Sequence, residues 1–75
     1  MERYQNLSGN SGVLAYEIGG DFIKVQFKDG SIYLYNYAST GQQDVETMKS
    51  LATNGSGLNS FISRYVRKAF AAKMR

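Results

Sequence analysis

The chain has 75 residues, of which 43% are hydrophobic, and it carries a formal net charge of +3. At this length it forms one small domain that buries about 60% of its unfolded surface, which leaves little room for an enclosed active site. Because cysteine and histidine are absent, disulfides, thiol nucleophiles and the usual zinc sites are excluded, and we expect a non-enzymatic protein without metal or cofactor.

Residues 1–10 are expected to be disordered, so that the single domain comprises residues 11–75. This stretch contains the turn residues of LSGNSG and no periodic apolar face. It also lacks the apolar core of a signal peptide, and no later run approaches the roughly 18 apolar residues that a membrane span needs. These features predict a soluble cytoplasmic protein.

Three strands are predicted at residues 13–18, 22–28 and 31–37, which are rich in β-branched and aromatic residues. A Gly-Gly-Asp turn and an Asp-Gly turn separate them, and this pattern is typical of two successive β-hairpins. In the middle strand Ile23, Val25 and Phe27 alternate with polar residues, so one face of the sheet is apolar and needs a cover.

The register of the second hairpin decides where Tyr33 and Tyr35 point. A two-residue turn at Asp29-Gly30 places both tyrosines, with Tyr37, on the outer face. A three-residue loop with Gly30 in the left-handed conformation shifts the pairing by one residue and points Tyr33 and Tyr35 into the core. Periodicity alone slightly favours the outward register, because Ile32 and Leu34 are then the inward pair.

Two helices are predicted after the strands. The first spans residues 41–53, from the capping-box spacing of Ser39 and Gln42 to the stop signal Asn54-Gly55. The second spans residues 58–74, where apolar residues recur at intervals of three and four. We therefore expect an α+β fold, a three-stranded antiparallel meander followed by two α-helices packed on one face of the sheet. The expected core consists of Ile23, Val25, Phe27, Val45, Leu51, Phe61, Ile62 and Val66.

Basic residues are concentrated near the C-terminus. Residues 1–53 contain six acidic and four basic residues, whereas residues 54–75 contain five basic and no acidic ones. Such asymmetry is typical of a segment that contacts phosphate, an anionic membrane or an acidic partner, although a charged helix face that only maintains solubility is more frequent. The helix dipole also accounts for Lys68, Lys73 and Arg75, which lie near the end of the expected helix.

Taken in order, SGVLAYEI, IKVQFKDGSIYLY and LATNGSGLNSFI resemble the KTSC domain, a family named for the C-terminal extension of some lysyl-tRNA synthetases and also found as free-standing bacterial and phage proteins. The resemblance covers about residues 11–66. Its most specific parts are the alternation in the middle strand, the Gly30 turn, the Tyr33 and Tyr35 pair, and the spacing of Gly55, Leu58, Asn59 and Ile62. The chain departs from the family pattern at Ala38-Ser39, where a proline is usual, at Ser63-Arg64, where the basic residue is shifted, and in a shorter first hairpin.

The resemblance implies that Tyr33 and Tyr35 point inward, because family members often carry a charged residue between them. This favours the bulged turn, with an exposed stacking platform as the alternative, and leaves Tyr37 open. Asn59 is interpreted first as a structural residue that caps the second helix or binds the loop before it, with ligand contact as the alternative.

The resemblance also implies RNA binding, since the family is attached to a tRNA-charging enzyme. We expect weak binding of RNA, such as tRNA, or of single-stranded nucleic acid. The residues expected to contact it are Lys24, Arg64, Arg67 and Lys68 at phosphates, and Tyr37 or Phe22 at an unpaired base. The main alternative is a protein-interaction module that forms a weak homodimer through an exposed sheet edge or the apolar stripe of the long helix. Membrane binding is not expected, because the apolar residues of the second helix are needed in the core.

Overall fold

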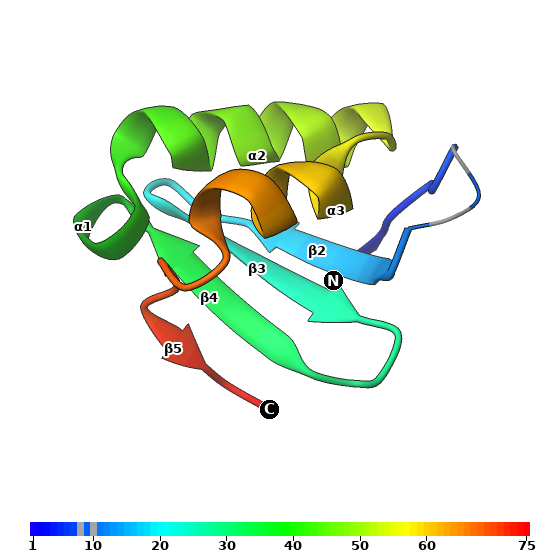
Figure 1. The fold of residues 1–75 in the computed structure, drawn as a ribbon, viewed down its shortest axis with the longest axis horizontal. Helices are drawn as coiled ribbons and strands as arrows, with labels where there is room; N and C mark the ends of the chain where they lie inside the picture. The colour runs from blue at the N-terminus through cyan, green and yellow to red at the C-terminus, as the bar shows by residue number, and fades with distance from the viewer. Residues whose placement is uncertain (8, 10) are drawn as a thin grey trace.

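The structure is a computed structural model that describes residues 1–7, 9 and 11–75. It is an α+β fold in which helices between the fourth and fifth strands pack against a five-stranded antiparallel sheet (Figure 1). The strands are β1 (Glu2–Arg3), β2 (Val13–Ile18), β3 (Phe22–Phe27), β4 (Ile32–Asn36) and β5 (Ala72–Lys73), and they lie in the sheet in chain order. The helices are α1 (Tyr37–Thr40), α2 (Gln42–Asn54), α3 (Leu58–Phe61) and the π-helix η1 (Ile62–Val66), which continues α3.

The β3–β4 hairpin has the bulged turn. The backbone N–H of Phe27 donates to the carbonyl of Ser31 at 2.8 Å, and the N–H of Gly30 donates to the carbonyl of Phe27 at 2.9 Å. Gly30 has φ +91°, which only glycine adopts without strain. The pairing then places Tyr33 opposite Val25 and Tyr35 opposite Ile23, so the inward register is confirmed.

Helix α2 lies within one residue of its predicted bounds. It ends at Gly55, which has φ 78° and whose N–H donates to the carbonyls of Leu51 and Ala52. The predicted capping box at its start is wrong. Ser39 lies in the short helix α1, whose first turn is capped by the side chain of Asn36 at 2.9 Å, and α2 follows Gly41 without a side-chain cap.

The second predicted helix is wrong after Val66. The chain leaves the helix there, turns back and adds β5 beside β4, with the N–H groups of Ala71 and Met74 donating to the carbonyls of Leu34 and Ile32 at 2.7 Å. This pairing satisfies backbone groups that the edge of β4 would otherwise expose. The sheet therefore has two more strands than the predicted meander, since β1 is added at the opposite edge.

The N-terminal residues are placed on the fold, in contrast to the predicted disorder of residues 1–10. Strand β1 pairs with β2, and Tyr4 is only 3% exposed, with its hydroxyl accepting a hydrogen bond from the N–H of Leu58 at 3.3 Å. One buried ring and two paired residues are enough to anchor this segment although it has no apolar periodicity. Ser8 and Asn10, to which the prediction also applies, lie outside the described residues.

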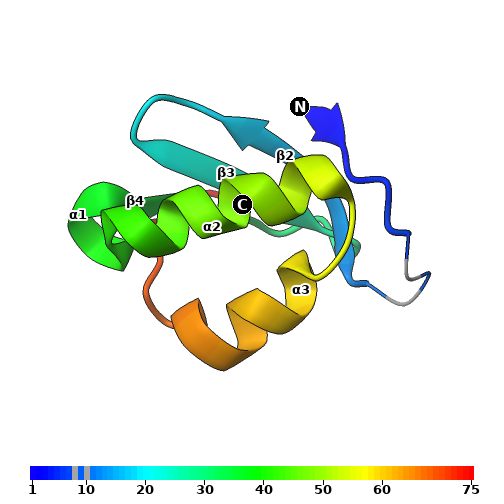
Figure 2. The same cartoon turned by 90° about the horizontal axis from the view of Figure 1, so that it is seen from above.

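The core lies between one face of the sheet and α2, α3 and η1. Helices α2 and α3 lie side by side over this face (Figures 1 and 2). Of the predicted core residues, five are buried and three, Phe27, Leu51 and Phe61, pack at its margin. The buried set also includes the following residues that the prediction did not name: Tyr4, Val13, Tyr16, Tyr35, Met48, Ala52 and Leu58.

The opposite face of the sheet has no helix over it among the described residues (Figure 1). Strand alternation and the β3–β4 pairing assign this face to Phe22, Lys24, Gln26, Ile32 and Leu34, all of which are half-buried. In the part of the chain that the structure describes, no helix is long and apolar enough to cross a membrane.

Candidate functional site

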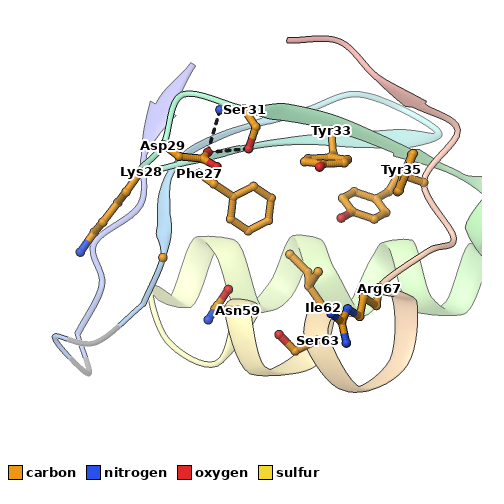
Figure 3. Close-up of a pocket in the computed structure, with 12 residues that line it drawn as sticks. Phe27, Lys28, Asp29, Ser31, Tyr33, Tyr35, Asn59, Ile62, Ser63 and Arg67 are labelled. Atoms are coloured by element: carbon orange, nitrogen blue, oxygen red, sulfur yellow. Dashed lines mark hydrogen bonds between the residues drawn. The ribbon is translucent and has the colours of Figure 1, made fainter.

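A cavity of about 470 Å³ opens between the β3–β4 hairpin and the α3–η1 segment (Figure 3). Side chains of the sheet project toward it from one side, and side chains of the helical segment project from the other. The two sides differ in chemistry, since the sheet side is mainly aromatic and the helical side mainly polar. The hairpin register and the packing of α3 on the sheet thus create the cavity together.

The sheet side consists of Phe27, Tyr33 and Tyr35, together with Phe70 from the turn before β5, and we call these four residues the aromatic wall. The ring of Tyr33 meets those of Phe27 and Phe70 edge to face, with centroids 5.7 and 4.8 Å apart, and Phe70 meets Tyr35 at 6.4 Å. Edge-to-face contacts of this kind fix the ring orientations. The aromatic wall is therefore held in place by contacts among its own rings.

Tyr35 is the most deeply buried member of the aromatic wall, at 2% exposure. Burial, with a smaller contribution from Tyr33, raises the pKa of Tyr35 to about 12. Its hydroxyl therefore stays protonated at neutral pH and offers a neutral hydrogen-bond donor.

The helical side of the cavity carries Asn59, Ser63 and Arg67, which we call the polar wall. Their spacing of four places them on one flank of the α3–η1 segment. None of the three side chains forms a hydrogen bond or ion pair with another described residue. An amide, a hydroxyl and a guanidinium are thus available to a ligand.

Asn59 is the second residue of α3, and Gly57 occupies the N-cap position with φ 87° and no side-chain cap. The predicted capping role of Asn59 is therefore wrong. Its side chain points into the cavity instead (Figure 3).

The hairpin tip closes one end of the cavity with Lys28, Asp29 and Ser31. The carboxylate of Asp29 accepts hydrogen bonds from the N–H and the hydroxyl of Ser31, at 2.9 and 2.6 Å. These bonds lower the pKa of Asp29. The negative charge of the cavity lining is therefore held at the hairpin end, while Arg67 lies at the other end (Figure 3).

Three of the predicted phosphate contacts, Arg64, Arg67 and Lys68, lie together and are exposed, and we call them the basic surface. Arg64 lies in η1 and the other two follow it directly, so their spacing of three and four places them on one side. The ion pairs among the described residues join other lysines to Glu17 and Glu46. Within this part of the chain, the basic surface is not neutralised by carboxylates.

Lys24, the fourth predicted phosphate contact, is on the face of the sheet away from the helices. Its Nζ lies 3.8 Å from a carboxylate oxygen of Glu17 and 5.8 Å from the ring centroid of Phe22. The structure therefore separates Lys24 and the stacking candidate Phe22 from the basic surface.

Tyr37, the predicted stacking residue, is engaged in a local network at the start of α1. Its hydroxyl donates to Glu46 at 2.6 Å, and Lys49 lies 2.7 Å from the same carboxylate and 5.6 Å from the ring centroid. The bonds from Lys49 and Tyr37 lower the pKa of Glu46, and the bond to Glu46 raises the pKa of Tyr37. Tyr37 does not line the cavity. Its contacts with Glu46 and Lys49 give it a structural role.

Sequence reasoning missed Phe27, Ser63 and Phe70 as parts of a site. The spacing of four from Asn59 through Ser63 to Arg67 was a usable signal, whereas Phe70 was assigned to a helix that ends before it. Comparison of the chain with protein families, curated proteins and solved structures finds no match. The resemblance to the KTSC domain stays a prediction that rests on its motifs.

Proposed function

We propose that this protein is a small non-enzymatic module that binds RNA or other single-stranded nucleic acid weakly, through the basic surface on and after η1. The observation that carries the proposal is the exposure of Arg64, Arg67 and Lys68 side by side, without carboxylate partners among the described residues. Arginine and lysine in this arrangement bind phosphates and release counterions from the nucleic acid. A cytoplasmic location, where tRNA and other single strands are present, fits this activity.

The distribution of acidic residues supports the same surface. Asp21 and Glu46 lie near the β2–β3 turn, where Tyr37 bonds to both the backbone of Asp21 and the side chain of Glu46. Asp29, at the other hairpin, is the acidic residue among those that line the cavity. No carboxylate among the described residues forms an ion pair with the basic surface, so its cations are available to the phosphates of a nucleic-acid strand.

The expected affinity is low. Three phosphate contacts supply no more than the micromolar binding that is typical of sequence-independent recognition near physiological salt. The resemblance of residues 11–66 to the KTSC domain supports RNA as the ligand class, because that family is linked to a tRNA-charging enzyme.

The test is a titration of isotope-labelled protein with a tRNA pool and, separately, with short single strands at low salt. We expect amide shifts to cluster around the basic surface, and Arg64→Glu and Arg67→Glu each to weaken binding about tenfold or more, since each variant reverses one charge at the surface. Lys24→Glu is the matched control, because it makes the same charge change on the other face of the sheet. Equal losses in all three variants would show a net-charge effect only, and the absence of any shift would reject the proposal.

Self-association is the second candidate, and the uncovered face of the sheet favours it. Phe22, Ile32 and Leu34 give this face an apolar part that no described helix covers. Sedimentation over a range of protein concentrations tests this candidate. A mass that rises with concentration, together with no response to nucleic acid, would replace the first proposal with this one.

A further inference from the structure

We propose that the cavity between the β3–β4 hairpin and the α3–η1 segment holds one unpaired nucleotide of the bound strand, with the base against the aromatic wall and the phosphate at Arg67. This inference rests on the function proposed above and specifies how the strand is held. Under this proposal, tight binding requires a base in the cavity as well as phosphates at the basic surface.

The dimensions of the cavity suit a ligand of this size. Its volume of about 470 Å³ lies within the range of about 300–1,000 Å³ that is usual for small-molecule sites. The helical side of the cavity ends in the exposed residues Ser63 and Arg67. A base can therefore enter while the sugar–phosphate chain stays outside and continues along the helix.

The aromatic wall provides the surface for the base. Phe27, Tyr33 and Phe70 hold one another edge to face at 5.7 and 4.8 Å, so little order has to be gained when a flat ring binds. Aromatic side chains that stack on bases tolerate any base, because every base has a π-face. The wall therefore predicts a requirement for a base without a preference for its identity.

The polar wall provides contacts for the rest of the nucleotide. The amide of Asn59 offers both donors and an acceptor to the edge of a base, and the hydroxyl of Ser63 can serve in either role. The guanidinium of Arg67 presents several N–H donors in one plane and binds phosphate oxygens in pairs. These groups have no partners among the described residues, so binding breaks no existing contact of theirs.

The charges at the two ends of the cavity favour one orientation of the nucleotide. Asp29 holds its negative charge at the hairpin end of the cavity through two bonds to Ser31, whereas Arg67 lies at the opposite end (Figure 3). Lys28 lies at the same end and offsets this negative charge, so a phosphate gains little there and is attracted at the Arg67 end. The uncharged base then points toward the hairpin.

Arg67 belongs to both the polar wall and the basic surface, and this favours a nucleic-acid strand over a phosphotyrosine peptide as the ligand. A strand with its nucleotide in the cavity carries neighbouring phosphates past Arg64 and Lys68, which are exposed beside Arg67. A phosphotyrosine peptide also combines a ring with a phosphate, but it offers no further phosphates to these two cations.

The experiment compares Ser63→Leu with Ser60→Leu. Both serines are exposed on the α3–η1 segment, but only Ser63 lines the cavity. Leucine at position 63 occupies the space of the base and leaves every cation in place. With a strand of about six uridines, we expect Ser63→Leu to raise the dissociation constant about tenfold and Ser60→Leu to leave it unchanged.

The second arm removes the base from the ligand. An abasic sugar–phosphate chain of the same length carries the same charge, and we expect it to bind the unaltered protein about tenfold more weakly than the uridine strand. Asn59→Ala, which empties part of the polar wall, is used in place of Ser63→Leu if the amide spectrum of that variant shows a changed fold.

The outcomes separate the two proposals. If the uridine strand and the abasic chain bind equally well and Ser63→Leu has no effect, while Arg67→Glu still weakens binding, the nucleotide site is rejected and the basic surface stands. If no strand binds at low salt, or if only a phosphotyrosine peptide occupies the cavity, both proposals are rejected.

Discussion

Tyr33 and Tyr35 face the same side of the sheet but differ in what surrounds them. Tyr35 is 2% exposed and belongs to the core, whereas Tyr33 is half-buried and contacts Phe27, Phe70 and the ammonium of Lys73, which lies 5.8 Å from its ring centroid. One residue therefore contributes chiefly to stability, and its neighbour also forms the wall of the candidate site.

Tyr35→Ala is expected to lower the free energy of unfolding by about 3–5 kcal/mol, because it leaves a cavity the size of an aromatic ring in the core. Urea denaturation followed by circular dichroism measures this change. The matched control is Tyr65→Ala, because Tyr65 is 66% exposed and its removal should cost only the ring contact with Phe61 at 5.0 Å, about 1 kcal/mol. Equal effects of the two substitutions would contradict the inward register.

Single residues of the site were only partly accessible to sequence reasoning. Arg64 and Arg67 were identified from charge, which is visible in the sequence. Lys24 was assigned to the same surface, although strand alternation placed it on the face opposite the apolar residues Ile23 and Val25. The position of the helices relative to that face was needed to separate it from the other cations.

At the scale of elements, the β3–β4 turn sets the register of the hairpin and thereby the position of the aromatic wall. Its geometry depends on Gly30, which has φ +91° and would place an added Cβ in open space. A substitution there tests the backbone conformation alone, because no neighbouring atom is in the way.

Gly30→Ala is expected to destabilise the protein by about 1–2 kcal/mol, the usual cost of a left-handed conformation for a residue with a Cβ. The control is Gly20→Ala in the other hairpin, where an added Cβ also meets open space but φ is not positive. It should be neutral or stabilising by up to about 1 kcal/mol, since alanine restricts the unfolded chain. The midpoint temperatures of thermal unfolding of the two variants measure this difference. Equal stability of the two variants would mean that the turn is not bulged.

Elements with their own local signal were predicted well, and elements that depend on distant partners were missed. The end of α2 at Gly55 follows from glycine chemistry within a few residues. At the β3–β4 turn the sequence around Gly30 indicated a turn but left its type open, periodicity slightly favoured the two-residue form, and the resemblance to the KTSC domain favoured the bulged form. Strands β1 and β5 are two residues long and form only because a neighbouring strand offers an edge. Phe70 continues the helical spacing in the sequence, yet it packs on Tyr33 and Tyr35 from a turn.

At the scale of the whole molecule, the basic surface predicts how binding depends on salt. With the three cations of the basic surface each contacting a phosphate of a single strand, the plot of log binding constant against log salt concentration should have a slope of about −2. Arg67→Glu should make the slope shallower by about 0.7 or more, because at least one phosphate contact is lost. Fluorescence titrations at several salt concentrations measure both slopes, and a slope near zero would indicate that charge does not drive binding.

The order of the strands has a consequence for the way in which the molecule folds and opens. Strands β2, β3 and β4 are neighbours both in the sheet and in the sequence, and the loops between them are short, which favours fast pairing. Residues 37–71 separate β4 from β5, so this pairing closes a longer loop and costs more conformational entropy. We therefore expect β5, which carries Lys73 beside the ring of Tyr33, to dock after strands β2 to β4 and to detach before them. We expect opening of β5 to leave the core intact and to uncover the side of the cavity beside Tyr33, and a bound nucleotide to reduce the population of such states.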